Sequence, residues 1–393
     1  MLCKEFSLPY RGYSMNKVDN KYTNMRVEFH ILQSFPVTCL NRDDVGAPKT
    51  AIVGGVTRAR VSSQCWKRAI RLALHEISGV ELGVRTKALS LLVANACKEE
   101  GASEEQAKTC GDKIERIFIK ESNKKTEDNS QEESEETKTD TLLFLAPSEV
   151  KLLAQKFKEV NFDANKLIIQ KDAKKQAKEL ADIIGKSKYA QTETLDGLDI
   201  ALFGRMVAQA PSMDVEAATS FGHAISTHRA VNEVEFFTAV ADFGQEQGSA
   251  HMGTLEFNAA TYYRYVSLDL GQLFETLGHT DEFFSKAVLA FIKALYIAVP
   301  SARQTTQAGA CLWDYAKVLV RKGQGVQLSF EMPVKAKDGS FLKPSIDEVN
   351  FSLQKKEKLS GSLFGKIASF DFGIDENFSI DDLISSVLNA IKV

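Results

Sequence analysis

The stretch RVEFHI, residues 26–31, decides the fold class of this chain. Its apolar residues Val27, Phe29 and Ile31 alternate with polar ones, which is the period of a half-buried β-strand. Similar patterns follow far along the chain, at 198–202, 260–270 and 326–330. A highly charged, helical block over about 85–188 separates the first strand from these later ones. The sequence therefore predicts an α+β sheet domain that carries a helical insertion.

Helix signals flank these strands. Ser62 and Ser63 are N-cap residues before an apolar stripe that runs from Trp66 to Ile77, and Gly79 ends the pattern. The residues before this helix, 34–61, are predicted to form a loop. Further helices are predicted over 147–185, 281–299 and 381–392.

The composition of the 393 residues is that of a globular protein. Hydrophobic residues make up 44% and charged residues 26%, which excludes a wholly disordered or fibrous chain. No apolar run has the form of a secretory signal, and the longest, 287–299, is too short to span a bilayer. The six cysteines form no C-x-x-C pair, so we expect a cytoplasmic protein without a disulfide scaffold or zinc site. Residues 1–24 show no periodicity and are expected to be a disordered extension, with Met15 and Met25 as alternative start sites.

The net charge of −3 conceals an uneven distribution. The first 80 residues carry a net charge of +6, and the stretch 45–75 contains no acidic residue. Segment 121–140 carries −5 and has no apolar residue, so it is predicted to be a disordered surface loop. A total near zero is therefore no evidence against a nucleic-acid partner.

The cations of the acid-free stretch indicate a phosphate-binding surface. They are Lys49, Arg58, Arg60, Lys67, Arg68 and Arg71. On the predicted helix, Lys67, Arg71 and His75 share the face opposite the apolar stripe. The helix dipole at Ser62 and the permissive Gly54–Gly55 pair favour the close approach of an anion. The same charges are also compatible with an ordinary solvated surface.

A projecting hairpin is predicted over 232–253, where Gly244 and Gly248 flank a polar tip. Phe236 and Phe237 lie near its root, and adjacent residues of a strand face opposite ways, so one ring is expected to be exposed. An exposed aromatic ring near basic residues can stack on the bases of a single strand. Periodicity alone also favours burial of both rings in a core.

The helical insertion contains a stripe of four lysines at positions i, i+3, i+4 and i+7. They are Lys171, Lys174, Lys175 and Lys178. Such a stripe can hold a duplex backbone without reading its sequence, although a solvated helix face has the same pattern.

Catalytic and metal-binding patterns are weak. His223 and His228 do not have H-E-x-x-H spacing and are predicted to be structural or surface residues. Asp43 and Asp44 have the form of a nuclease carboxylate pair, but pairing with Arg42 or capping of a turn explains them as well. No G-x-S-x-G, Walker or G-x-G-x-x-G motif is present. We therefore expect no catalytic residue, no cofactor and no metal.

Seven blocks of sequence, taken in order, resemble one family. They are CLNRDD (39–44), RVSSQCWKRAIR (60–71), LDIALFGRM (198–206), AISTH (224–228), EFFTAVADF (235–243), EQGSAHMGT (246–254) and YYRYVSL (262–268). In these blocks the chain resembles the backbone subunit of the type I-E CRISPR Cascade complex, the CasC-like family. The resemblance runs from about Arg26 to beyond Pro300 and weakens in the helical insertion, in the acidic segment and after Arg321.

The resemblance implies a hand-like α+β subunit with an RRM-like (ferredoxin-like) palm, helical fingers and a thumb β-hairpin. The implied parts are the extension (1–24), the palm (25–84, 191–231 and 256–393), the fingers (85–190, with the acidic loop 121–140) and the thumb (232–255). Copies would stack head to tail in a helical filament along a CRISPR RNA, and each thumb would kink the guide at regular intervals. Together with other Cascade subunits they would support pairing of the guide with target DNA, and no membrane is involved.

The resemblance also implies roles for residues. Guide phosphates would be held by Arg42, Arg60, Ser62, Gln64, Lys67, Arg68 and Arg71. The kink would be wedged by Gly204 and Met206 and by Phe236, Phe237 and Met252 on the thumb. Family members often have Trp at the position of Phe236. Target DNA would be gripped by Lys171, Lys174, Lys175 and Lys178.

The expected function is that of a non-enzymatic RNA-binding scaffold in antiviral defence. Two alternatives stay open. Type III backbone subunits resemble this fold and cut target RNA with a loop aspartate, a role that Asp43 or Asp44 would fill here. A general single-strand binder outside CRISPR would bind any RNA and copurify without a guide of defined length.

Overall fold

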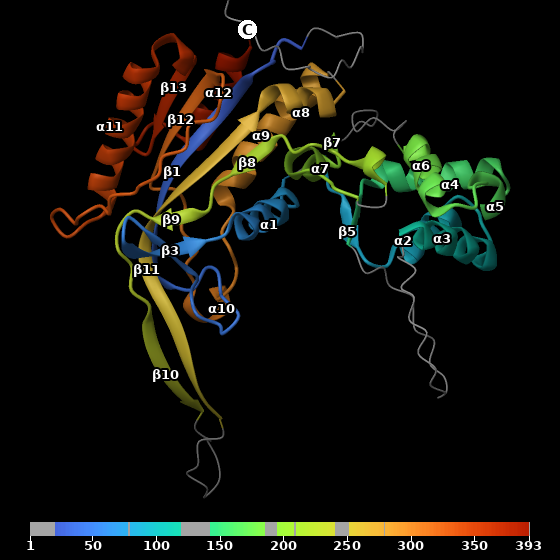
Figure 1. The fold of residues 1–393 in the computed structure, drawn as a ribbon, viewed down its shortest axis with the longest axis horizontal. Coiled ribbons are helices and arrows are strands. Elements are labelled where there is room, and N and C mark those ends of the chain that lie inside the picture. The colour runs from blue at the N-terminus through green and yellow to red at the C-terminus, as the bar shows by residue number, and fades with distance from the viewer. Residues whose placement is uncertain are drawn as a thin grey trace, which may run out of the picture.

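The computed structural model describes residues 20–77, 79–118, 142–184, 195–207, 210–239, 251–278 and 280–392. The chain before residue 20, the acidic segment 121–140 and the hairpin tip with Gly244 and Gly248 lie outside the described residues. Figure 1 shows a sheet domain, a helical unit beside it and a long two-stranded arm. We call these parts the palm, the fingers and the thumb. A mixed α/β fold with a large antiparallel sheet is thereby confirmed.

The palm is built on a nine-stranded sheet in the order β13-β12-β1-β11-β9-β3-β2, with β8 and β10 also paired to β11. Its strands are β1 (Met25–Thr38), β2 (Thr50–Val53), β3 (Val56–Val61), β8 (Thr219–Phe221), β9 (Ala224–Ser226), β10 (Glu233–Ala239), β11 (His251–Asp269), β12 (Tyr315–Lys322) and β13 (Lys366–Phe372). The strand predicted from residues 26–31 is central, since β1 pairs antiparallel with both β11 and β12. β10 and the first part of β11 form the two arms of the thumb.

Helices cover the two faces of this sheet differently. The face that carries Val27, Phe29 and Ile31 packs against α1 (Ser63–Leu74), α8 (Leu270–Thr276), α9 (Asp281–Ile297) and α12 (Ile380–Ile391). The opposite face packs against α11 (Leu342–Ser360), the short η2 (Gly361–Phe364) and the chain over 326–334. The predicted helices from 281 and from 381 are confirmed to within two residues. The helix after Ser62 is confirmed too, but it ends at Leu74, before the predicted end of its apolar stripe at Ile77. Tyr22, in the predicted extension, packs in the palm core and is 4% exposed.

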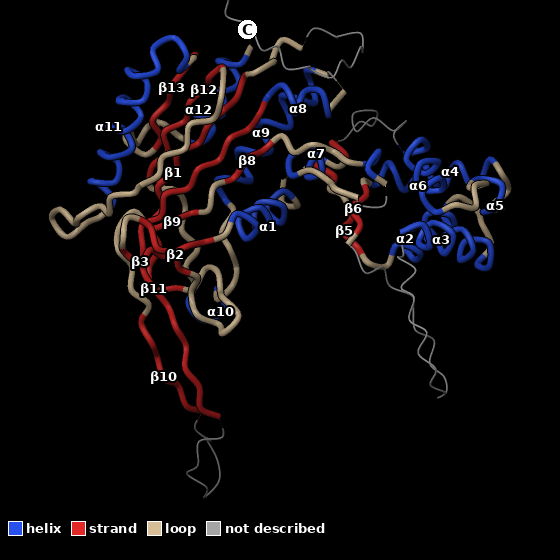
Figure 2. Tube along the Cα trace, in the orientation of Figure 1, coloured by secondary structure: helices blue, strands red, loops and turns tan. Residues whose placement is uncertain are grey.

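The fingers have a hydrophobic core of their own. Their helices are α2 (Leu89–Glu99), α3 (Glu104–Phe118), α4 (Pro147–Glu159), α5 (Ala164–Leu167) and α6 (Ala173–Ile184). Between fingers and palm lie α7 (Leu198–Phe203), η1 (Pro211–Met213) and two small sheets, which pair β4 (Val80–Glu81) with β7 (Leu195–Asp196) and β5 (Val84–Thr86) with β6 (Leu143–Leu145). Figure 2 shows this helical unit joined to the palm through short strands.

Two strand predictions are wrong. Residues 198–202 lie in α7, and all five are buried, so the helix has no polar face to reveal its 3.6-residue period. Residues 326–330 are not a strand, because side chains of the sheet take the place of a partner strand. The N–H of Val326 donates to Glu28 Oε1 at 2.8 Å, and that of Leu328 donates to the Tyr263 hydroxyl at 3.1 Å.

The predicted loop 34–61 also differs from the structure. It contains the end of β1 and the β2–β3 hairpin, which turns at Gly54 and Gly55 with φ of +61° and +75°. A Cβ at Gly54 would lie 1.8 Å from the Glu331 carbonyl oxygen, so the close backbone approach permitted by this glycine is to the protein's own chain.

Candidate nucleic-acid interface

The start of α1 joins two of the sequence blocks. Ser62 is its N-cap, and its Oγ accepts a hydrogen bond from the Cys65 N–H at 3.3 Å. The Ser62 N–H donates to Asn41 Oδ1 at 3.0 Å, which ties the helix to the loop that contains Arg42. The first turn has no acidic residue, so the positive end of the helix dipole is not neutralised within the helix. Gln64 and Arg42 are exposed beside it.

A basic strip extends from this helix onto the edge of the sheet. We define it as Lys49, Arg60, Lys67 and Arg68. The Arg60 guanidinium donates to the Thr50 carbonyl oxygen at 3.1 Å and lies 3.3 Å from His223 Nδ1. Burial lowers the pKa of His223, and the positive charges of Arg60 and Lys49 lower it further, so the ring is neutral and accepts from Arg60.

The cations of the basic strip have no carboxylate partner among the residues that the structure describes. Lys67 is half-buried, with Nζ 5.5 Å from the centre of the Phe221 ring, and burial lowers the pKa of its ammonium group. Arg68 is exposed. Unpaired cations beside a helix N-terminus form a surface that suits phosphates.

Two hollows adjoin α1. One is lined by residues 40–46 with Cys65 and Ala302, and the other runs along Arg68 and Leu72 towards Ser301 and Gln304. Both are lined by Cys65 and Ala302, so they meet at the start of the helix.

Residues of segment 301–304 line parts of both hollows. The segment contains no sequence motif and was not predicted to belong to the site. Its Arg303 and the loop residue Arg42 both lower the pKa of the buried Cys39, although burial has the larger, opposite effect. Arg303 therefore adds positive charge beside the loop.

Two predicted surface cations are instead internal. Arg58 is fully buried, and its guanidinium donates to the carbonyl oxygens of Ser226 at 2.6 Å and of Phe330 at 2.9 Å. Arg71 forms an ion pair with Asp199, with 2.7 Å between Nε and Oδ2, and its side chain is only 20% exposed. The predicted common face of Lys67, Arg71 and His75 is thus not a uniform cationic surface.

Asp43 caps a turn. Its Oδ1 accepts from the N–H groups of Val45 at 3.0 Å and Ala47 at 2.9 Å. Asp44 is exposed. Across the described ranges, no group of three or more His, Cys, Asp or Glu residues could hold a metal ion.

His228 is a structural residue, which is one of the two alternatives predicted for it. Its ring stacks on that of Phe341 with centroids 3.7 Å apart, and its Nε2 accepts from the Thr261 N–H at 3.2 Å. Burial lowers the pKa of this ring, which stays neutral.

The thumb presents one aromatic ring to solvent. Phe236 is 63% exposed. The ring of Phe237 packs across the hairpin onto Gly253, where an added Cβ would lie 2.6 Å from it. One of the two rings is therefore exposed, and the alternative that periodicity favoured, burial of both rings in a core, is wrong for Phe236. The side chain of Met252 lies outside the described ones.

The other proposed wedge residues lie far from the thumb. Gly204 ends α7 with φ of +79°, and Met206 beyond it is 83% exposed. Between them Arg205 is buried in an ion pair with Glu149 at 2.7 Å. Figure 1 shows α7 beside the fingers and β10 at the opposite end of the palm. Met206 and Phe236 are therefore not brought together within one chain.

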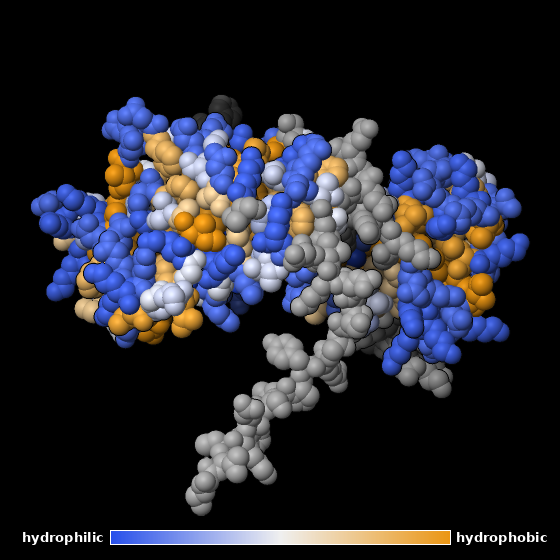
Figure 3. All heavy atoms as spheres, turned by 90° about the horizontal axis from the view of Figure 1, so that it is seen from above, coloured by the Kyte–Doolittle hydropathy of each residue, from blue (hydrophilic) through white to orange (hydrophobic). Residues whose placement is uncertain are grey.

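The lysine stripe lies at the surface of the fingers. All four lysines are exposed, but α6 begins at Ala173, so Lys171 precedes the helix. The prediction of four lysines on one helix is thus wrong for Lys171. The side chain of Asp172 accepts the N–H of Lys175 at the start of the helix, so the helix begins after Lys171. Hydrophilic residues cover much of the face in Figure 3, over both palm and fingers. In the described part of the chain, no helix is long and apolar enough to cross a membrane.

Comparison with solved structures defines the class of protein. A chain of a "CRISPR RNA-guided surveillance complex, pre-nicking" superposes with a TM-score of 0.74 at 28% identity, covering 93% of this chain and 100% of that one. A chain of a "CRISPR RNA-guided surveillance complex" shares the fold, with a TM-score of 0.65 at 24% identity and coverage of 93% and 99%. The profile of the CT1975-like protein family matches residues 27–370, so the chain belongs to that family. No curated protein matches it. The resemblance to Cascade backbone subunits is thereby confirmed.

Proposed function

We propose that this chain is the CRISPR RNA-binding backbone subunit of a type I-E Cascade complex. The observation that carries the proposal is the basic strip beside the N-terminus of α1, whose cations have no carboxylate partner among the described residues. Because phosphates are the most abundant anions of an RNA, such a strip binds RNA without reading its sequence. The solved surveillance-complex chain of 28% identity supports the same assignment.

We propose further that the palm is RRM-like. The strand order β12-β1-β11-β9, with α1 following β1 and α9 following β11, supports this interpretation. The face with His30, Tyr263 and Tyr265 is covered by α11 and the chain over 326–334, so these rings are buried. The guide RNA therefore runs along the edge beside α1 and not across that aromatic face.

We propose that copies stack head to tail, and the separation of Met206 and Phe236 supports this arrangement. Both are exposed, yet they lie at different ends of one subunit. Contact between the thumb of one copy and the α7 region of the next would place them together at the guide. A repeated contact of this heterologous kind generates a helical filament, whose length the RNA would limit. The lysines of the fingers would then face target DNA, and base pairing would supply specificity.

We propose that the subunit is a scaffold and not a nuclease. The turn held by Asp43 supports this role, since its carboxylate already binds two backbone N–H groups. Cleavage by Asp43 or Asp44 is the alternative function.

The experiment that tests the basic strip is the salt dependence of RNA binding. We expect Lys67→Ala to lower the slope of log K against log[salt] by about 0.7, the value for one phosphate of a single strand. Lys286→Ala is the matched control, because Lys286 is exposed and already paired with Glu282 at 2.7 Å. An unchanged slope in Lys67→Ala, or an equal loss in Lys286→Ala, would refute the assignment.

A further inference from the structure

Three segments at the junction of the palm and the fingers contact one arginine of α1. Arg71 Nη2 donates to the Gly83 carbonyl oxygen at 2.6 Å, and its Nε donates to Asp199 Oδ2 at 2.7 Å. Its guanidinium also lies 5.0 Å from the centre of the Phe144 ring. Gly83 is on the segment that leaves the palm, Phe144 is on β6 and Asp199 is on α7. One side chain of the palm thus contacts all three segments.

Two of the partners of Arg71 also bind each other. The Gly83 N–H donates to Asp199 Oδ1 at 2.8 Å, so Asp199 is bound by both Arg71 and Gly83. Asp199 is fully buried, and a buried carboxylate is tolerated only where such partners compensate it. A Cβ at Gly83 would lie 2.6 Å from the Phe144 ring, so only glycine permits this packing.

Hydrophobic packing at this junction is small by comparison. The palm and the fingers have separate cores. Among the described residues, the cluster between them has two buried members, Ala146 and Ile200, with Phe144 and Val215 packed against it. The buried ion pair of Arg205 and Glu149 lies at the same junction. Because each unit has its own core, we expect each to fold without the polar contacts of Arg71.

We propose that Arg71, Asp199 and Gly83 form a latch that sets the orientation of the fingers relative to α1. Arg71 is then a positioning residue and not a phosphate contact. The inference rests on the proposed function, in which α1 holds the guide through Lys67, one turn before Arg71 on the same helix. The latch would transmit the position of the guide to the exposed lysines of the fingers, and so align them with the backbone of target DNA.

The test uses the assembled guide-containing complex and compares two variants. The double variant R71M/D199N removes both charges of the latch without leaving a buried carboxylate unpaired. We expect it to keep the melting temperature, the guide content and the salt slope of guide binding. Its affinity for complementary DNA should fall about 2- to 30-fold, the range of coupling through such networks. The matched variant Arg68→Met lies on the same helix with an exposed side chain, and it should lower the salt slope by about 0.7.

Each outcome of this test either supports or refutes the latch. If R71M/D199N lowers the salt slope of guide binding as Arg68→Met does, Arg71 contacts a phosphate and the latch is refuted. If the double variant binds target DNA like the wild type, the latch is also refuted. Arg71→Lys keeps the charge but lacks the planar fork that reaches both acceptors, and it should give an intermediate loss of target affinity. Failure of the proposed function has another signature, since the wild-type protein would then hold no guide.

Discussion

At the scale of single residues, the central strand β1 contains a buried histidine whose ring is neutral at neutral pH. His30 of β1 is fully buried, and its Nδ1 lies 2.9 Å from the Tyr263 hydroxyl. That hydroxyl oxygen also accepts the Leu328 N–H, so the hydroxyl proton is donated to His30. Burial lowers the pKa of His30 to about 3, and the positive charge of Arg321 acts in the same direction.

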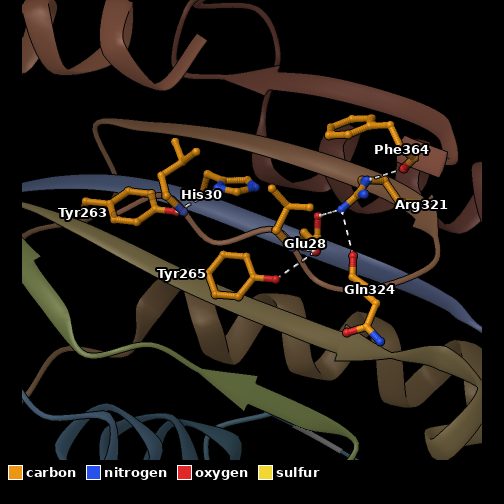
Figure 4. Close-up of polar contacts among 9 residues, drawn as sticks. Glu28, His30, Tyr263, Tyr265, Arg321, Gln324 and Phe364 are labelled. Carbon is orange, nitrogen blue, oxygen red and sulfur yellow. Dashed lines mark hydrogen bonds and ion pairs between the residues drawn. The ribbon is translucent and has the colours of Figure 1, made fainter. Parts of the chain in front are cut away.

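The neighbouring Glu28 shows why the chain over 326–330 needs no partner strand. Figure 4 shows its carboxylate accepting from the Tyr265 hydroxyl at 2.8 Å and from Arg321 Nη1 at 2.6 Å. Arg321 also donates to the carbonyl oxygens of Phe364 and Gln324. These polar side chains hold the covering segment and η2 on the sheet.

We predict that His30 makes the protein less stable as the pH falls. An unfolded histidine binds a proton below a pH of about 6.5, whereas folded His30 stays neutral until about pH 3. Between these values this one group removes about 1.4 kcal/mol from the free energy of unfolding per pH unit. The free energy of unfolding should be measured with denaturant between about pH 6 and pH 4. We expect it to depend less steeply on pH in His30→Gln than in the wild type, by the uptake of one proton. A slope equal to that of the wild type would contradict the burial of a neutral His30.

Asp43 allows the scaffold and nuclease functions to be separated. We expect the assembled complex to leave complementary RNA intact in the presence of magnesium. Asp43→Ala should lower stability by about 0.5–2 kcal/mol, as the loss of a capping side chain does, without changing the RNA. Periodic cuts made by the wild type and absent from Asp43→Ala would establish the nuclease instead.

At the scale of elements, the proposed function gives the thumb the most specific action on the guide. Removing the exposed ring in Phe236→Ala should weaken stacking by about 1–3 kcal/mol for one base. We expect the periodic reactivity of guide nucleotides to hydroxyl acylation to diminish, with no change in melting temperature or salt slope.

Phe237→Ala is the matched control for the thumb, because Phe237 packs on Gly253 within the hairpin. It should lower the stability of the thumb itself. If Phe236→Ala leaves the periodic pattern unchanged, Phe236 does not wedge the kink.

The elements also show which parts of the fold could be predicted from the sequence. The helix after Ser62 has one buried face, and the strand 26–31 alternates apolar and polar residues, so their periodicity reveals them. The strand is nevertheless buried on both faces, because Glu28 and His30 are covered as well. α7 is buried all round and leaves no such pattern. The segment 326–330 alternates like a strand because two of its side chains are buried, although its backbone bonds to side chains.

The site was predictable to the same limited degree. Charge composition located the basic strip, but it did not distinguish Arg58 and Arg71, whose partners Ser226 and Asp199 lie more than 100 residues away. Arg303 and Gln304 reach the start of α1 only through tertiary packing. Local patterns hold no information on such long-range partners.

At the scale of the whole molecule, charge and shape together support a filament on RNA. The +6 charge of the first 80 residues contributes the basic strip of the palm, while the segment with −5 belongs to the fingers. The thumb and the α7 region present exposed Phe236 and Met206 at separate places on one subunit. In the proposed function, such a chain would act through its neighbouring copies and the RNA that they share.

The central claim is tested most directly by sequencing the nucleic acid that copurifies with the protein expressed beside its companion subunits and a CRISPR array. The account predicts RNA of one defined length that contains spacer sequence, bound by several copies of this chain. RNA of mixed length and unrelated sequence would contradict it and would establish a general single-strand binder.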